Sequence, residues 1–468
     1  MSKEKSDIKI GLEIHMHLKT NEKLFCNCKI PTKDDSPNTT ICPRCTGQPG
    51  CKPMLPNKKA LFAVIKLGLV CNSKITKKTN FQRKHYTWPD MPTGYQRTVS
   101  GGHIKENAIG GSLNGINMTE IHLEENPAAW DPKTGEINYN RAGFPLAEIV
   151  TEPEFTSTDE LKQWLKELIL IGKYLGIYNE EFGIKSDVNV SIKESGYKRV
   201  EIKNVNSYNN IVAAAIAEIK RQRECVKKKI EIKQETRRYN DELDETQFMR
   251  SKENAQDYMF TPEPDLPNLI IDDKTIKDLE KQIPQMPKVK RENYSKYGFD
   301  SETIEVLVSN LYLTEIFEHA ISKKLNPKEV GLFLRREILR VLNYNKEDFI
   351  DLEKKNIKDE IIKLIELLGE EKISYTTAQK TLEKLYDAKF DVKKYIEKEG
   401  LIQVQDDSLI EELVKKALKE APQAVEDYKK TGNTKPLNFI VGIVMRETKG
   451  TANPQKVNKT MMKILKEL

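Results

Sequence analysis

The chain has 468 residues, of which 38% are hydrophobic and 32% charged, and its formal net charge is +6. This length predicts two or three domains with separate cores, and so mild a positive charge identifies no partner by itself. A membrane-spanning protein is excluded, because the longest apolar run near the C-terminus, FIVGIVM at 439–445, is far shorter than the roughly 20 residues of a membrane helix.

The N-terminal segment lacks the apolar stretch of a signal peptide, which predicts a cytoplasmic protein with reduced thiols. Its first patterned stretch, GLEIHMHL at 11–18, indicates a strand with two different faces. Leu12, Ile14, Met16 and Leu18 share one face, and Glu13, His15 and His17 share the other. The apolar face predicts a core strand, and the polar side chains could converge on one ion or substrate.

Four of the seven cysteines fall in two close pairs, CNC and CPRC, at Cys26, Cys28, Cys42 and Cys45. In a reduced compartment this spacing indicates a tetrahedral four-cysteine zinc site, and the compartment disfavours disulfides. Because four thiolates leave no open position for water, we expect the ion to be structural. The other cysteines are most simply single packed or surface thiols.

The segment FQRKHYTWPDMPTGYQ at 81–96 combines cations with aromatic rings. Arg83 and Lys84 could meet phosphate, while Tyr86 and Trp88 could pack a base or the acceptor end of a nucleic acid. An ordinary basic strand and turn is the alternative. The chain has neither a P-loop nor a G-x-G-x-x-G motif, so any ATP site must be built differently.

Two further segments place acids in strand-like runs. EIHLEEN at 120–126 sets Glu120, His122 and Glu124 on alternate positions with Glu125 adjacent, and GFPLAEIVTEPEF at 143–155 sets Glu148 in an apolar strand. For any one segment, pairing with Lys or Arg on a solvated sheet face is the simpler account. Together with GLEIHMHL, they favour a divalent-cation site that suits Mg²⁺ bound to nucleotide phosphates.

A helix and two strands follow these segments. The run 157–177 begins with a capping box at Ser157 and Glu160, ends near Gly176, and carries an apolar side that predicts packing on a sheet. The runs 186–192 and 199–207 alternate apolar and polar side chains as strands do. Roughly the first 270 residues therefore predict an α+β region with a mixed or antiparallel sheet.

After PEPDLP at 262–267 the composition changes to a helical pattern rich in Leu, Lys and Glu. Pro284 and Pro287 indicate a linker, and we expect a domain boundary near residue 292. Asn326 and Pro327 predict the start of a helix at 327–342, and a further break falls near Gly400. The last third is therefore predicted to be all-helical.

The C-terminal segment combines a basic excess with helix signals. Residues 429–468 hold nine Lys or Arg against two Glu, an excess that could neutralise phosphates. Gly442 lies in one predicted helix, and Asn453 caps a final helix whose first amides, with Lys449 and Lys456, would suit a backbone phosphate. A solvated pair of helices joined by a capped turn is the alternative.

Taken in order along the chain, these segments resemble the B-subunit family of the aspartyl/glutamyl-tRNA amidotransferases. The resemblance runs from about residue 9 to the end and rests on IGLEIHMHLKT, the cysteine pairs, RKHYTWPDMPTGYQ, IHLEEN, YNRAGFPLAEIVTEPEF, SDVNVSI, VEIKNVNSYNN, QETRRYN, PEPDLP and GTANPQKVN. It implies a cradle domain at 1–292 for ATP, Mg²⁺ and the tRNA acceptor end, with its zinc knuckle at 26–45. It further implies a helical domain at 293–400 and a tRNA-binding tail at 401–468.

The resemblance also implies a reaction and partners. Such a subunit uses ATP to phosphorylate the side-chain carboxylate of Asp-tRNA(Asn) or Glu-tRNA(Gln), and ammonia then displaces phosphate. Ammonia comes from glutamine at a separate amidase, the A subunit. The chain is therefore expected to act as an ATP-dependent ligase in a three-subunit complex with this amidase and a small C subunit. A non-discriminating aspartyl- or glutamyl-tRNA synthetase is a further candidate partner.

Matching motifs assign roles to individual residues. The implied metal ligands are Glu13, His15, Glu124, Glu125 and Glu148, and the implied catalytic residues are Lys84, Tyr86, Glu124 and Glu125. The implied cofactor-binding residues are Lys203, Asn204 and Asn206, and the implied tRNA-binding residues are Gly442, Lys449, Asn453 and Lys456. His17 stands where the family usually has no ligand.

The chain departs from the family pattern at a few positions. Asn126 stands where the family usually has an acid, and Met259 and Thr261 replace an Arg and a Phe.

Two alternatives stay open. An archaeal E-type homologue specific for Glu-tRNA(Gln) would carry an extra domain after PEPDLP, where only about 25 residues precede the helical part. A tRNA-binding scaffold with a decayed kinase site is the other.

Overall fold

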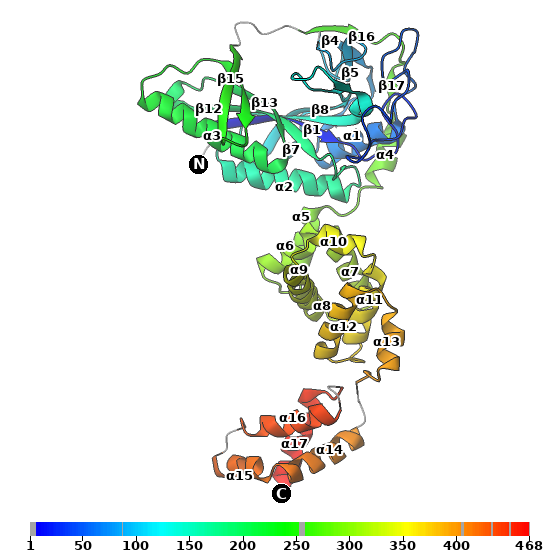
Figure 1. The fold of residues 1–468 in the computed structure, drawn as a ribbon, viewed down its shortest axis with the longest axis vertical. Helices are drawn as coiled ribbons and strands as arrows, with labels where there is room; N and C mark the ends of the chain where they lie inside the picture. The colour runs from blue at the N-terminus through cyan, green and yellow to red at the C-terminus, as the bar shows by residue number, and fades with distance from the viewer. Residues whose placement is uncertain are drawn as a thin grey trace. The chain divides into compact units, whose positions relative to one another are not determined.

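The computed structural model describes residues 6–86, 88–251, 258–403, 407–431, 434–448 and 451–467. It divides the chain into two compact units, Met1–Met286 and Pro287–Leu468 (Figure 1). We expect a boundary near residue 292, and the units divide between Met286 and Pro287. The assignment of three ranges to three separate roles stays a prediction.

The first unit is built on a β-sheet. Its strands are β1 Ile8–His17, β2 Lys74–Ile75, β3 Lys78–Thr79, β4 Gln82–His85, β5 Tyr95–Thr98, β6 Ala108–Ile109, β7 Ser112–Leu113, β8 Ile116–Glu125, β9 Ala129–Trp130, β10 Ile137–Asn138, β11 Pro145–Thr151, β12 Ile184–Ile192, β13 Val200–Asn206, β14 Glu235–Asn240, β15 Glu245–Ser251, β16 Met259–Pro262 and β17 Leu269–Ile270.

Thirteen of these strands form one sheet, whose main path runs β15-β14-β13-β12-β1-β11-β8-β5-β4-β16. The pairs along this path are antiparallel except β13 with β14, so the sheet is mixed. β6 and β7 pair with β8, and β2 pairs with β6. Four helices accompany the sheet: α1 Lys58–Val70, α2 Thr158–Tyr174, α3 Tyr208–Lys227 and α4 Asp273–Glu280. The predicted α+β class is confirmed.

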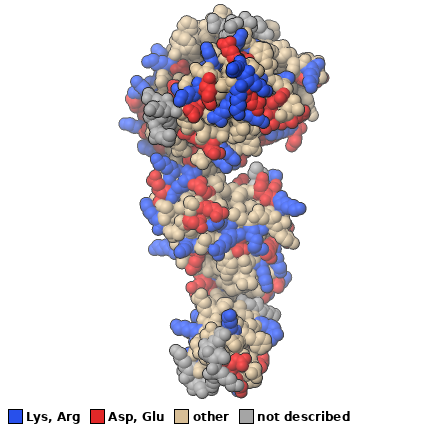
Figure 2. Space-filling model, turned by 90° about the vertical axis from the view of Figure 1, so that its left-hand side faces the viewer, with Lys and Arg blue, Asp and Glu red and all other residues tan. Residues whose placement is uncertain are grey.

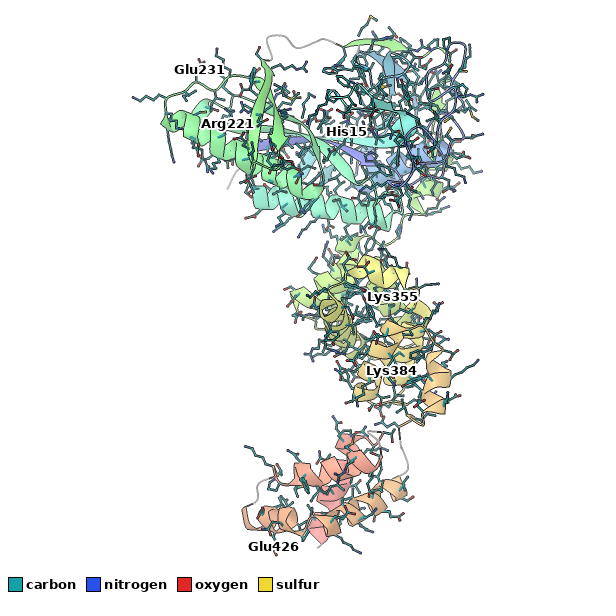
Figure 3. All side chains as sticks on the ribbon, viewed as in Figure 1. His15, Arg221, Glu231, Lys355, Lys384 and Glu426 are labelled. Atoms are coloured by element: carbon teal, nitrogen blue, oxygen red, sulfur yellow. The ribbon has the colours of Figure 1, made fainter. Side chains whose placement is uncertain are left out.

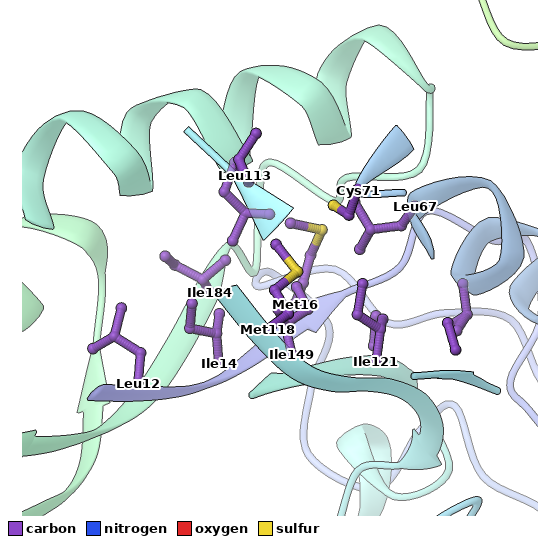
Figure 4. Close-up of a cluster of buried hydrophobic side chains, with 14 of the residues drawn as sticks. Leu12, Ile14, Met16, Leu67, Cys71, Leu113, Met118, Ile121, Ile149 and Ile184 are labelled. Carbon is purple, nitrogen blue, oxygen red and sulfur yellow. The ribbon is translucent and has the colours of Figure 1, made fainter. Parts of the chain in front are cut away.

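One face of the sheet is the core. Figure 4 shows Leu12, Ile14 and Met16 of β1 packed with Ile149 of β11 and Ile184 of β12, and all five are buried. Because side chains alternate along a strand, the polar residues between them project from the opposite face. The two-faced pattern expected for β1 is therefore confirmed, and it places the polar residues on the sheet face away from this core.

The helix α2 has the predicted start and end. Ser157 Oγ accepts from the Glu160 amide at 3.1 Å, while Glu160 Oε2 accepts from the Thr156 amide at 2.8 Å. Gly176, with φ +66°, follows the last turn, a conformation that glycine adopts without strain. The apolar side of α2 belongs to the core of the sheet, with Trp164 only 2% exposed.

The elements of the second unit are all helices in the described ranges. They are α5 Pro287–Ser295, α6 Ser301–Ser309, α7 Leu311–Ser322, α8 Pro327–Phe333, α9 Leu339–Asn345, α10 Phe349–Lys354, α11 Lys358–Gly369, α12 Tyr375–Asp387, α13 Val392–Lys398, α14 Asp407–Glu420, α15 Pro422–Thr431, α16 Leu437–Glu447 and α17 Pro454–Glu467.

Helix α8 begins as predicted, because the Asn326 side chain accepts from the Lys328 amide at 3.1 Å and Pro327 occupies the first turn. A single π-turn at Leu334–Ile338 links α8 to α9. Helices α14, α16 and α17 bury a core of their own, which includes Val414, Ile440 and Val457. None of the helices in the described ranges combines the length and the apolar character that crossing a membrane would need.

Candidate metal and substrate site

Four polar side chains form a row across the middle of the sheet. His15 of β1 lies opposite Lys185 of β12 on one side and Glu148 of β11 on the other, and Glu148 lies opposite His122 of β8. Figure 3 labels His15 in the first unit. Residues directly opposite in an antiparallel sheet have Cβ atoms about 5 Å apart, so this register brings together side chains more than 100 residues apart.

The row closes into a compact cluster around Glu148. Its Oε2 atom lies 3.4 Å from His15 Nε2 and 3.4 Å from His122 Nε2. His15 Nε2 also lies 3.3 Å from Glu124 Oε1, and His122 Nδ1 lies 3.1 Å from Glu120 Oε1. Glu124, Glu148 and His122 are all buried, so these charges act on one another with little screening by water.

The carboxylates of the cluster differ in their tendency to ionise. Burial would raise the pKa of Glu148, but His122 and His15 hold it well below its ordinary value. Burial and the charge of Glu148 raise the pKa of Glu124. Burial, with the charges of Glu148 and Asp187, raises the pKa of Glu13 to about 7. The acids therefore repel one another, and a cation placed among them would relieve that repulsion.

The donor atoms suit a bound cation. Glu13, His15 and Glu148 each offer a ligand atom within 4.8 Å of the others, and Glu120, His122 and Glu148 form a second such group. Glu124 Oε1 is buried without a hydrogen-bond partner in the described structure, although His15 lies close to it. Carboxylate oxygens are the ligands that Mg²⁺ and Mn²⁺ prefer, and imidazole is compatible with several divalent ions. The residues therefore fit a divalent-cation site.

Glu125 does not join this cluster. Its Oε1 atom accepts from the Arg97 amide at 2.9 Å and lies 3.2 Å from Arg97 Nη1. The physical reason is the alternation of side chains along β8, which sends neighbours to opposite faces. We expect Glu124 and Glu125 to act as ligands together, and the structure instead separates them.

Lys84 and Tyr86 come from β4 and the turn after it. Burial alone would lower the pKa of Lys84, but the charges of Glu148, Glu124 and Glu13 raise it above its ordinary value. The Lys84 ammonium lies 4.8 Å from the ring centroid of Tyr258, which also contacts Tyr86 at 6.1 Å between centroids. The structure thus brings Lys84 within electrostatic reach of the carboxylate cluster.

The residues expected to bind the cofactor lie on β13. Lys203 Nζ lies 2.6 Å from Asp187 Oδ2, and the Asn204 amide donates to Asp187 Oδ1 at 2.7 Å. A register shift between Ser186 and Val188 sets two residues of β13 against one of β12, and such a bulge re-aims side chains. Asn206 ends the strand, paired with Lys185.

The four predicted zinc ligands lie together. The Sγ atoms of Cys26, Cys28, Cys42 and Cys45 lie within 4.8 Å of one another. The hydrogen bond from Cys26 lowers the pKa of Cys45 to about 5, helped by the charge of Lys23, whose Nζ lies 3.5 Å from Cys45 Sγ. The hydrogen bond with Cys45 raises the pKa of Cys26, and burial raises the pKa of Cys28. Four sulfur atoms this close together fit a zinc ion, which binds thiols as thiolates.

Glycine is required in the knuckle. Gly47 has φ +65°, and a Cβ there would lie 2.5 Å from the carbonyl oxygen of Pro92. A residue with a side chain at position 47 would therefore collide with the backbone of Pro92. It would also have to adopt a positive φ, which strains residues other than glycine.

The predicted tRNA-facing residues are in the second unit. Asn453 caps α17 by accepting from the Gln455 and Lys456 amides at 2.9 and 3.3 Å. Among the described residues outside its own helix, none has an atom within 4 Å of the position a Cβ would take at Gly442, and Lys449 lies outside the described residues. On the face drawn in Figure 2, basic and acidic side chains are interspersed, so the charge on that face marks no single nucleic-acid surface.

Some residues of the site were missed by the sequence analysis. Asp187 alternates with apolar residues in SDVNVSI, so the period-two rule that selected Glu13 could have selected it. His122 was not missed by this rule, since it alternates with Glu120 and Glu124 in EIHLEEN, but it is absent from the ligands that the resemblance implies. Arg97 has no local signal, because its buried partner Glu263, 2.9 Å away, is 166 positions distant.

The positions that depart from the family pattern also have partners. Asn126 Nδ2 lies 3.0 Å from His17 Nε2, and His17 Nδ1 lies 3.1 Å from the Gly183 carbonyl oxygen. These contacts hold His17 outside the metal-ligating groups. Thr261 Oγ1 lies 3.0 Å from His85 Nε2, and Met259 is exposed.

Comparison with known proteins gives matches along both units. Residues 8–277 match the family model of the GatB/GatE catalytic domain, and residues 315–465 match that of the GatB domain. Curated relatives named as the B subunit of aspartyl/glutamyl-tRNA(Asn/Gln) amidotransferase are similar over nearly their whole length. That of Methanobrevibacter smithii is 42% identical over 98% of this chain and 99% of its own. That of Methanocaldococcus jannaschii is 39% identical over 98% and 97%, respectively.

Proposed function

Since the chain belongs to the family of the GatB/GatE catalytic domain, we propose that it is the subunit of a tRNA-dependent amidotransferase that phosphorylates and amidates an acidic side chain on tRNA. The substrate class is Asp-tRNA(Asn), Glu-tRNA(Gln) or both, in keeping with the names of its relatives. Its partners are an amidase subunit that releases ammonia from glutamine and a small third subunit. We expect the complex to work in the cytoplasm.

The observation that carries this proposal is the buried cluster around Glu148. Two histidines and at least three carboxylates converge there. A cation would relieve the repulsion among the carboxylates. Mg²⁺ bound there would neutralise the phosphates of ATP. The ligands we assign to it are Glu13, His15, Glu124 and Glu148. Glu125 has a positioning role instead, because it contacts Arg97.

The chemistry needs an activated carboxylate, because the oxygen of a free carboxylate is a poor leaving group. An oxygen of the side-chain carboxylate attacks the γ-phosphorus of ATP, the bond to the bridging oxygen breaks, and ADP leaves. Ammonia then attacks the carbonyl carbon of the acyl phosphate. The bond from carbon to the phosphate oxygen breaks, and the amide forms with loss of a proton and of inorganic phosphate.

The remaining residues bind and orient. Lys84, which the carboxylates hold in its charged form, is placed to neutralise charge on the transferred phosphoryl group. Tyr86 would line the pocket for the acceptor end. The floor under the nucleotide would be formed by Lys203, Asn204 and Asn206. Asp187 fixes the first two through contacts with the Lys203 ammonium and the Asn204 amide.

Two further sites support the reaction from a distance. A structural zinc ion held by the four cysteines would order the knuckle, and its ligands are separate from the carboxylate cluster. Gly442, Lys449, Asn453 and Lys456 would contact the tRNA, where the open space beside Gly442 leaves room for a backbone.

The test is amide formation by the complex reassembled with its partner subunits. With ATP and glutamine, Asp-tRNA(Asn) and Glu-tRNA(Gln) are supplied in separate reactions, and amide on at least one is expected. Replacing Glu148→Gln should lower the rate about 100-fold or more, because the cluster loses a charge that ligates the metal. The exposed Glu242→Gln is the matched control and should keep wild-type rate.

Binding of Mn²⁺ followed by electron paramagnetic resonance separates a metal defect from a folding defect. The Glu148→Gln complex should bind deacylated tRNA normally and lose Mn²⁺ affinity. Wild-type complex that binds tRNA and forms no amide on either substrate would reject the enzymatic proposal in favour of a tRNA-binding scaffold.

A further inference from the structure

The polar face of the sheet continues beyond His15 into a pocket of about 640 Å³ in the first unit. Lys185 lines this pocket and lies opposite His15 in the β1–β12 register, so the pocket borders the carboxylate cluster. Its other walls include the start of α3 and the loop around Asp35. A volume of this size is typical of sites for small ligands.

Two cations on this pocket have only neutral hydrogen-bond partners within the described ranges. Lys185 Nζ donates to Asn126 Oδ1 at 3.5 Å, and no ion pair holds it in the part of the chain that is described. Arg141 donates from Nε to the Pro127 carbonyl oxygen at 3.1 Å and from Nη2 to the Ala128 carbonyl oxygen at 2.7 Å. Those two bonds fix the guanidinium plane, and its Nη1 atom makes no hydrogen bond within the described ranges.

These cations are held in an unfavourable state. Burial lowers the pKa of Lys185, and the charge of Arg141 lowers it further. Burial likewise lowers the pKa of Arg141. Two half-buried positive charges that face one pocket repel each other, and an anion between them would relieve that repulsion.

A helix N-terminus adds to the positive electrostatic potential of the pocket. Asn206, Ser207 and Tyr208 at the start of the 20-residue helix α3 line the pocket. The first amides of a helix have no intrahelical acceptor, and its dipole favours a negative charge there. Tyr208 lines the same wall, and its side chain packs against the hydrophobic core.

The acids at this pocket are already engaged. Asp35 Oδ2 accepts from the Thr32 amide at 2.7 Å, Glu181 accepts from the Lys33 amide, and Glu180 forms an ion pair with Lys173. Three further acids act on the cations without pairing with them: Asp90, Glu124 and Asp187 raise the pKa of Lys185, and Asp90 raises that of Arg141. For both cations, burial outweighs these charges. None of these acids forms an ion pair with Lys185 or Arg141 within the described ranges.

We propose that this pocket receives the side-chain carboxylate of the aminoacyl group, with Lys185 and Arg141 as its binding groups and the start of α3 beside them. The inference rests on the proposed function, in which that carboxylate must reach the phosphoryl group held at the neighbouring cluster. It also gives the pocket a means of rejecting product. An amide offers the two cations no negative charge, so the amidated side chain should bind more weakly than the acid.

The test compares an acid with its amide on the same tRNA. Equilibrium binding to the intact complex is measured without ATP for Asp-tRNA(Asn), Asn-tRNA(Asn) and deacylated tRNA(Asn), or the corresponding Glu and Gln forms if those are the substrates. We expect wild type to prefer the acid about tenfold or more. Lys185→Met should abolish the preference and leave deacylated tRNA unaffected, Lys185→Arg should retain it, and the exposed Lys193→Met is the control.

Each outcome has one meaning. Equal weakening of all three tRNAs by Lys185→Met would overturn the inference and assign Lys185 to a tRNA phosphate. An acid preference that survives Lys185→Met would also overturn it. Because amide formation by wild type is measured in parallel, a wild type that amidates and shows either result refutes the pocket alone. A wild type that amidates neither substrate refutes the proposed function and the pocket with it.

Discussion

Glu263 forms ion pairs with two arginines of the first unit, Arg83 and Arg97. It is 3% exposed, and its two oxygens lie 2.7 Å from Arg83 Nη2 and 2.9 Å from Arg97 Nε. Burial alone would raise the pKa of Glu263, but hydrogen bonds from Arg83 and the charge of Arg97 hold it below its ordinary value of 4.5. Arg97 also forms an ion pair with Glu125, the neighbour of Glu124 on β8. Glu263 therefore holds in place an arginine that contacts the strand carrying the carboxylate cluster.

We expect Glu263→Gln to lower the free energy of unfolding of the first unit by about 1 to 3 kcal/mol near pH 7, because it removes the carboxylate that joins the two guanidinium groups and leaves each with one acid, Glu125 for Arg97 and Asp265 for Arg83. The pH dependence follows from the depressed pKa of the folded state. The stabilisation by Glu263 is complete above about pH 4.5 and is lost as pH falls through the lower, folded pKa. The difference between wild type and Glu263→Gln should therefore shrink below about pH 4.5.

Urea unfolding followed by tryptophan fluorescence measures this difference, because all three tryptophans, Trp88, Trp130 and Trp164, belong to the first unit. Exposed Glu242→Gln is the control. A difference that stays constant down to about pH 3 would show that Glu263 stabilises the unit by packing rather than by charge.

The sequence alone predicts single residues of the site only where one strand decides their direction. Alternation along β1 selected Glu13 and His15 correctly as residues of one face. The same alternation along β8 places Glu125 and Glu124 on opposite faces. The family motif nevertheless implies both as metal ligands. Asp187 and Glu263 become important only through partners on other strands, and register and bulges, set by the folded sheet, decide which residues those are.

At the scale of elements, the cysteine knuckle carries a prediction of its own. Four Sγ atoms within 4.8 Å, one with its pKa lowered to about 5, fit a tetrahedral ion. We expect the purified protein to contain about one zinc ion per chain, and Cys42→Ser to lose most of it. Zinc content by atomic absorption and release to a colorimetric chelator measure the effect.

Cys51→Ser is the matched control, since Cys51 is an exposed thiol close to the knuckle but outside the cluster. Binding of Mn²⁺ at the carboxylates should survive Cys42→Ser, because the two clusters share no ligand. Folded protein without zinc and with all four thiols open to titration would refute the site.

Elements with strong local signals could be predicted from the sequence, and the arrangement of the sheet could not. The cap of α2 at Ser157 and the start of α8 at Asn326 follow from side chains that accept amide hydrogens within three positions. The sheet order places β1 between β11 and β12, a neighbourhood decided by contacts over more than 100 residues. The row from Lys185 to His122 exists only because of that order.

At the scale of the whole molecule, the second unit contains a segment with its own apolar core. Val414, Ile440 and Val457 belong to the core cluster of α14, α16 and α17, all of which follow residue 406. The first unit has a separate core on its sheet. Removal of the chain after Gln403 should therefore leave the first unit folded, with an unchanged urea midpoint by tryptophan fluorescence and unchanged Mn²⁺ affinity.

The same truncation should weaken binding of tRNA about tenfold or more, because it removes a segment whose residues 429–468 carry nine basic against two acidic side chains. The logarithm of the affinity should also fall less steeply with the logarithm of salt, by about one unit of slope for each phosphate that the segment neutralises. Filter binding of deacylated tRNA by the intact and truncated chains at several salt concentrations measures both. An affinity and a salt slope that equal those of the full chain would place tRNA recognition outside this segment.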